Sequence, residues 1–201
     1  MAISVKIHKK WIRRVLVTTA QGRPVIVPVE RAQKVGLLLT VGALVMETAL
    51  FLILWGAEPL RALVAGPVDV LWAIAIYFGG VVLHEGIHGL GFWLFGKASP
   101  KDIQFGVLWK YLTPYAHLKK PIRARAYRLS LLAPGIGLGL FPLLLGLFLG
   151  SPGLSLFGAV FLGAAGGDLA VDWEVRKLPH DVYVLDHPHE IGFFVFEKET
   201  P

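Results

Sequence analysis

The sequence predicts a mainly α-helical, polytopic membrane protein with four transmembrane helices and a small cytoplasmic β element from its N- and C-terminal segments. Three observations support this fold class. Of the 201 residues, 55% are hydrophobic and 17% are charged. The mean hydropathy of +0.62 is too high for an ordinary soluble domain. The charges gather in blocks between long uncharged runs, as loops alternate with spans, and the length fits a single domain over residues 1–201.

The uncharged runs give the order of the spans. The first span is expected at residues 35–55 and the second at residues 70–95. A third uncharged run, broken only at residues 150–153, is long enough for two more crossings at about 1.5 Å per residue. We therefore expect four helices within residues 35–171, with a loop at residues 97–128 between the second and the third.

Strand-like patterns lie outside the spans. Residues 1–34 are expected to form a β-hairpin-like unit around a turn at residues 21–23. The tail, residues 172–201, has two strand-like stretches around a turn that contains His187 and His189. We expect these segments to form a small sheet that covers the helix ends. Two sharper alternatives stay open, namely a strand edge that holds an extended peptide and a tail histidine that acts beside a metal site.

The distribution of lysine and arginine predicts the orientation. Eight of them precede the first span and eight more lie from Lys97 to Arg128, whereas the loop between the first two spans has only Arg61. The positive-inside rule therefore puts both termini and the long loop in the cytoplasm, in a multi-pass protein of the cell membrane. The long loop mixes its charges with aromatic residues, which suits contact with anionic membrane lipid. The net charge of +6 has the same origin, so we expect no nucleic-acid partner.

A metal-binding pattern lies inside the second span, where His84, Glu85 and His88 form a His-Glu-x-x-His sequence. On a helix this spacing puts both imidazoles on one face, where they can bind one tetrahedral Zn²⁺. Glu85 then lies beside the metal without binding it and can take a proton from water that the metal activates. The alternative is a hydrogen-bonded pair of core histidines. It is disfavoured because such polar groups are costly within a span unless they face a cavity, a partner or a metal.

The third metal ligand is expected to be Asp168. The chain has no cysteine, so a zinc site must use nitrogen and oxygen ligands. His84 and Asp168 each lie about 21 Å along helices that descend in the same direction, which gives them a similar depth near the cytoplasmic leaflet. Gly166 and Gly167 would let a neighbouring helix approach closely. Asp172, one turn further on, is the alternative ligand.

Glu47 is another acidic residue within a span. Counted from residue 35 at the cytoplasmic face, it lies about 18 Å up the first helix, above the depth expected for the metal. We therefore expect a hydrogen-bonded carboxyl between helices and not a metal ligand. A proton or water path is the functional alternative.

Several motifs, taken in order, resemble those of the putative zincin peptidase family of small prokaryotic membrane proteins. The resemblance implies a zinc-dependent membrane endopeptidase, and a more distant likeness is to site-2 proteases. The chain departs from site-2 proteases because it has no asparagine and because its Asp follows two glycines instead of preceding one. The motifs lie between residues 70 and 196 and are His84-Glu85-x-x-His88, Lys119-Lys120-Pro121-Ile122, Leu131-Leu132-Ala133-Pro134-Gly135, Gly166-Gly167-Asp168 and Asp186-His187-Pro188-x-x-x-Gly192-Phe193.

The motif and the resemblance together lead us to expect a zinc metalloprotease. His84, His88 and Asp168 would hold Zn²⁺, and Glu85 would act as general base and later as proton donor. Its partners would be protein or peptide substrates in or beside the membrane, cleaved near the cytoplasmic leaflet. The alternative is a non-proteolytic membrane protein with a structural zinc that binds a partner or lipid. A zinc transporter is less favoured, because the outer half of the spans offers little polar character. The substrate, the oligomeric state and the roles of His117 and the tail histidines stay open.

Overall fold

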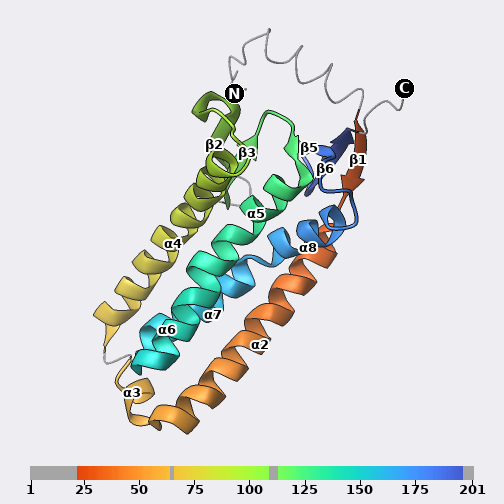
Figure 1. Ribbon diagram of the computed structural model, residues 1–201. Helices are drawn as coiled ribbons and strands as arrows, with labels where there is room; N and C mark the ends of the chain where they lie inside the picture. The colour runs from red at the N-terminus through yellow and green to blue at the C-terminus, as the bar shows by residue number, and fades with distance from the viewer. Residues whose placement is uncertain (1–21, 64–65, 109–112, 197–201) are drawn as a thin grey trace.

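The chain forms a bundle of long helices with its strands gathered at one end. The computed structural model describes residues 22–63, 66–108 and 113–196, and this part of the chain is mainly helical, as predicted. The short helix α3 (Glu58–Arg61) lies at the opposite end of the bundle from the strands (Figure 1). The strands and α3 therefore mark the two ends of the bundle.

Three helical segments are long and apolar enough to cross a membrane, namely α2 (Val29–Trp55), α4 (Pro67–Leu94) and the segment Ala124–Leu149. All three begin earlier than predicted, α4 by three residues. Helix α2 begins six residues before residue 35, and the third segment begins inside the predicted loop of residues 97–128. The first turns of these helices contain charged residues, so the length of an uncharged run does not reveal them. A helix can include such residues because its backbone hydrogen bonds hold it together and the charged side chains extend into polar surroundings.

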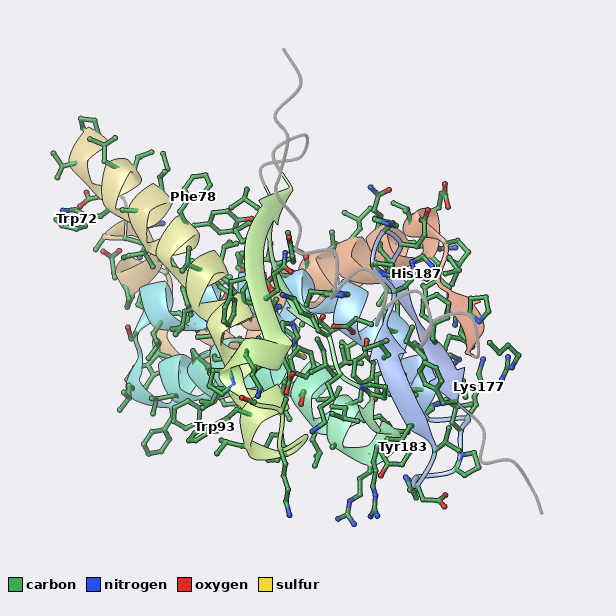
Figure 2. The ribbon with its side chains drawn as sticks, turned by 90° about the horizontal axis from the view of Figure 1, so that it is seen from above. Trp72, Phe78, Trp93, Lys177, Tyr183 and His187 are labelled. Atoms are coloured by element: carbon green, nitrogen blue, oxygen red, sulfur yellow. The ribbon has the colours of Figure 1, made fainter. Side chains whose placement is uncertain are left out.

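Helix α4 carries the predicted metal-binding motif and lies on the outside of the bundle. It begins at Pro67, and the Gly66 N–H donates to the carboxylate of Asp69 at 2.9 Å, as is typical of a helix start. Trp72, Phe78 and Trp93 lie on its outer surface (Figure 2) and are 65%, 59% and 52% exposed. Large exposed apolar side chains on a long helix are consistent with contact to lipid.

The third segment contains α5 (Ala124–Pro134), a π-helical turn (Gly135–Leu140) and α6 (Phe141–Leu149). Gly150 ends α6 in the left-handed conformation with φ of 67°, which glycine adopts without a steric penalty. The Trp55 indole N–H, at the end of α2, donates to the Leu147 carbonyl at 2.8 Å. The last turn of α6, just before the turn predicted at residues 150–153, is thus joined to the end of α2.

The last apolar helices, α7 (Pro152–Ala164) and α8 (Gly166–Val175), meet at a bend of 46° and together are long enough to be one further span. Both pack against α2, and the contact is close because small residues meet there. A Cβ on Gly163 would lie 1.8 Å from Thr40 Oγ1, and one on Gly166 would lie 2.2 Å from Gly36 Cα. Gly166 thus allows the close helix contact predicted for it, whereas a Cβ on Gly167 would meet nothing within 4 Å.

A four-stranded antiparallel sheet connects segments from both ends of the described chain. Its strand order is β1–β6–β5–β4, and the two tail strands expected from the sequence are confirmed as β5 and β6. In the predicted N-terminal hairpin, the first strand lies outside the described residues, and the second is shorter than expected and pairs with the tail strand β6. The four strands are β1 (Arg23–Ile26), β4 (Ile122–Arg123), β5 (Tyr183–Asp186) and β6 (Gly192–Phe196).

A separate hairpin follows α4 where only a basic loop was predicted. A single 3-10 turn (Pro100–Asp102) leads into β2 (Ile103–Leu108), which pairs along its whole length with β3 (Thr113–Leu118). Strand β3 also contacts α4, so the hairpin lies against the helix that carries the motif. Figure 2 shows Tyr183 of β5 and His187, in the turn after β5, on the other side of the hairpin from Trp72.

We predict that the contact between α6 and α7 tolerates no side chain at Gly158. A Cβ there would lie 2.2 Å from the Leu143 backbone nitrogen and 2.6 Å from the Gly139 carbonyl oxygen. Gly158→Ala should therefore lower the free energy of unfolding by about 1–3 kcal/mol, as overpacking does, measured by SDS titration in detergent with circular dichroism. Gly42→Ala is the matched control, because its Cβ would meet nothing within 4 Å. Equal stability of the two variants would contradict this packing.

Candidate metal and catalytic site

Two buried histidines of α4 face one carboxylate of α8. His84 and His88 lie one helical turn apart, with ring centroids 4.9 Å from each other. His84 Nε2 is 3.1 Å from one oxygen of Asp168, and His88 Nε2 is 3.2 Å from the other. Asp168 is in the first turn of α8, directly after the bend from α7. The fold therefore brings together the three residues that the sequence predicted as metal ligands.

The spacing of these groups fits a tetrahedral metal ion. Ligands at about 2.0–2.2 Å from Zn²⁺ in tetrahedral geometry lie roughly 3.3–3.6 Å from one another, a little more than the two nitrogen–oxygen distances here. One ligand atom from each residue can be chosen so that all lie within 4.8 Å of one another. His84 Nδ1 is buried and has no hydrogen-bond partner within the described part of the chain. The three side chains could therefore hold one cation between them, and His84 keeps one nitrogen that no described group contacts.

The orientation of His88 is fixed from behind by α5. Its Nδ1 is 3.0 Å from the Ser130 carbonyl oxygen, which can only accept, so Nδ1 carries the proton. In a neutral ring Nε2 then presents a lone pair towards Asp168, as metal-binding histidines commonly do. Gly91 allows this approach of α4 to α5, because a Cβ at that position would lie 2.9 Å from Ser130 Cα.

Glu85 lies beside the three residues but contacts another element. Its Oε2 accepts a hydrogen bond of 2.7 Å from the Ala116 backbone N–H of β3. This bond holds the carboxylate at the side of the site on which the β2–β3 hairpin lies. A carboxylate so placed can exchange a proton with a molecule bound next to His84 and His88.

The other acidic residues weighed from the sequence have different partners. Asp172 forms an ion pair with Arg128, whose Nε lies 2.7 Å from its Oδ1, and it is not part of the histidine cluster. Glu47 is fully buried and accepts a hydrogen bond of 2.5 Å from Ser155 Oγ. Glu47 is therefore a hydrogen-bonded carboxyl between α2 and α7, as expected, and Asp172 stabilises the contact of α5 with α8.

The polar residues of the tail form a second cluster. Asp186, at the end of β5, accepts hydrogen bonds from the Tyr127 hydroxyl and from the Leu118 N–H, the latter at 2.7 Å. His117 Nδ1 is 3.8 Å from the same carboxylate. Burial raises the pKa of Asp186 and lowers the pKa of His117. His187 accepts hydrogen bonds from the backbone of its own turn and does not join the three candidate ligands.

Sequence reasoning missed the groups that orient the site. The Ser130 carbonyl and the Ala116 N–H are backbone groups, so no residue type marks them. The close contact at Gly91 was the one available signal, because small residues in a span often mark helix contacts. The tail aspartate Asp186 was noted within a motif, but its reach to β3 and α5 depends on tertiary structure.

Comparison with known proteins bears on the same segment. A family model described as putative zincin peptidase matches residues 77–183, which is more than half of the chain. The matched segment contains His84, Glu85, His88 and Asp168, and ends before Asp186. No curated protein and no solved structure gives a significant match.

We predict that Asp168 and Asp172 differ sharply in metal binding. Asp168→Asn should weaken Zn²⁺ binding by more than the roughly 10–100-fold that loss of an outer hydrogen-bond partner costs, because it removes a charged ligand. Asp172→Asn should bind Zn²⁺ as the wild type does and lose only stability, since its carboxylate pairs with Arg128. Competition titration with a chromogenic chelator measures both affinities. Equal affinities in the two variants would exclude Asp168 as a ligand.

Proposed function

The chain belongs to the putative zincin peptidase family, and we propose that it is a zinc-dependent membrane endopeptidase. It would hydrolyse peptide bonds of protein substrates in or beside the membrane, near the cytoplasmic leaflet. The observation that carries this proposal is the convergence of His84, His88 and Asp168 at hydrogen-bond distance, with Glu85 adjacent in sequence to the first histidine. A buried cluster of this composition is what a catalytic zinc site with an open fourth position requires.

In the proposed mechanism the two histidines and Asp168 hold the metal. Bound zinc acts as a Lewis acid that polarises the scissile carbonyl and makes water more acidic. The Ser130 carbonyl keeps His88 in the tautomer that presents Nε2. The two histidines are buried and Asp168 is partly buried, so little of their surface would be open to competing water.

Glu85 moves the proton. Its carboxylate takes a proton from the attacking water and then delivers it to the nitrogen of the departing amine, which restores the starting state. The Ala116 N–H holds one carboxylate oxygen, so the other can be directed to the water. The substrate must be unwound at the cleaved bond, because helical backbone is already hydrogen-bonded to itself.

We further propose that α7 and α8 form a fourth, bent span and that both termini are cytoplasmic. The strand end of the bundle carries basic residues from several elements, including Arg23, Arg123 and Arg176, which the positive-inside rule assigns to the cytoplasm. His84 lies ten residues before the end of α4 nearest the hairpin, or about 15 Å along the helix. This depth supports cleavage in the cytoplasmic half of the membrane, where the basic surface would contact anionic lipid.

The decisive test compares the wild type with Glu85→Gln in detergent. Both should contain about one Zn²⁺ per chain by elemental analysis, because Glu85 is not a proposed ligand. The wild type should cleave an unfolded model protein, and the variant should lose at least about 100-fold in kcat, the lower end of the range for loss of a general base.

The outcomes separate the candidate functions. Zinc in both proteins with cleavage by both would remove Glu85 from the mechanism. Zinc in both with cleavage by neither would favour a structural zinc site. Absence of zinc from both would overturn the proposal of a metalloprotease.

A further inference from the structure

We propose that Asp186 is a positioning residue that sets the place of the catalytic carboxylate Glu85 by anchoring strand β3. This inference rests on the proposed function and extends it to the tail, beyond the segment that the family model matches. Asp186 lies at the end of β5, and its hydrogen bonds in the described part of the chain go to Leu118 and Tyr127, not to Glu85 or the candidate metal ligands. Its effect on them passes through two sets of contacts.

The first set runs through β3. The Leu118 N–H donates to Asp186 Oδ2 at 2.7 Å, and the Ala116 N–H, two residues earlier, donates to Glu85 Oε2 at 2.7 Å. In a strand, residues two apart point their backbone groups to the same edge. The edge of β3 that does not pair with β2 is therefore held at two neighbouring points by carboxylates from α4 and from the tail. A shift of β3 at Leu118 would displace the donor that orients Glu85.

The second set runs through α5. The Tyr127 hydroxyl donates to the other oxygen of Asp186, and the Tyr127 ring is buried and stacked on Phe92 at 6.1 Å. Phe92 in turn is stacked on His88 at 6.4 Å between ring centroids. Helix α5 also supplies the Ser130 carbonyl that orients His88. One carboxylate thus connects the tail, the hairpin and the helix behind the proposed metal site.

The chemistry of Asp186 suits this role. Its side chain is only 14% exposed, and each oxygen accepts a hydrogen bond from a different element. A buried carboxylate is strongly held by such donors, because leaving either unpaired is costly. His117, with Nδ1 at 3.8 Å, adds a polar neighbour on β3 itself.

Hydrogen exchange of single amides tests the proposal without relying on activity. The full-length protein in detergent would be compared as wild type, Asp186→Ala and Asp186→Asn. In Asp186→Ala the amides of Leu118 and of Ala116 should both exchange roughly tenfold faster or more, as expected when a hydrogen bond to a charged group is lost. Asp186→Asn keeps one acceptor oxygen and should give a smaller effect at both amides. If the alanine variant does not fold, the exchange rates of Asp186→Asn alone test whether Asp186 anchors β3.

Matched controls and kinetics complete the test. Glu190→Gln alters an exposed carboxylate of the same tail and should leave both amides unchanged. Tyr127→Phe removes only the α5 contact and should speed exchange less than Asp186→Ala. With the unfolded model protein, Asp186→Asn should lower kcat while KM and zinc content stay near wild type, because it acts on Glu85 and not on binding.

Faster exchange at Leu118 with unchanged exchange at Ala116 would overturn the proposal, since Asp186 would then hold β3 without affecting the donor to Glu85. A fall in zinc content equal to the fall in kcat would overturn it as well. If the wild type cleaves nothing, the proposed function fails, whereas the exchange of the two amides still decides whether Asp186 anchors the donor to Glu85.

Discussion

The contact of Asp168 with His84 and His88 is the constraint on which the rest of the molecule depends. A carboxylate inside an apolar bundle costs several kcal/mol unless opposite charge or hydrogen bonds compensate it. The two imidazoles can compensate the Asp168 carboxylate only if α4 and α8 keep a fixed rotation about their axes and a fixed depth relative to each other. An imidazole nitrogen lone pair and a carboxylate oxygen that face each other at about 3 Å repel unless a proton or a metal ion lies between them. The cluster therefore links the stability of the helix bundle to its capacity for a cation.

The backbone geometry that satisfies this constraint comes from small residues. Gly163 and Gly166 bring α7 and α8 against Gly36 and Thr40 of α2, directly beside the bend that precedes Asp168. On the other side, Gly91 lets α4 approach α5 closely enough for His88 to contact the Ser130 carbonyl. In lipid, where apolar side chains gain little by leaving their surroundings, such close backbone contacts supply much of the packing energy.

The strands at the end of the bundle do more than cover helix ends. The hairpin β2–β3 supplies the N–H that contacts Glu85, and the tail supplies Asp186, which contacts both that hairpin and α5. The candidate site thus consists of an apolar part, which holds the proposed metal ligands, and a polar part, which orients the carboxylate of Glu85. The two parts come from segments far apart in the sequence, and packing of Tyr127 and Phe92 between them joins the parts.

The sequence by itself determined the mainly helical class, the apolar helices, the tail strands and the pairing of the two motif histidines, because these follow from hydropathy and from local periodicity. Counting residues along helices also favoured Asp168 over Asp172 as the third ligand, since the depth of a residue in a membrane follows from its position along its helix. The tertiary structure alone decided that Arg128 pairs with Asp172, that the basic loop contains a hairpin, and that the Ser130 carbonyl and the Ala116 N–H orient the site. Backbone donors and acceptors are the same at almost every residue, so their use in a site depends on which elements meet and leaves no mark in the amino-acid sequence.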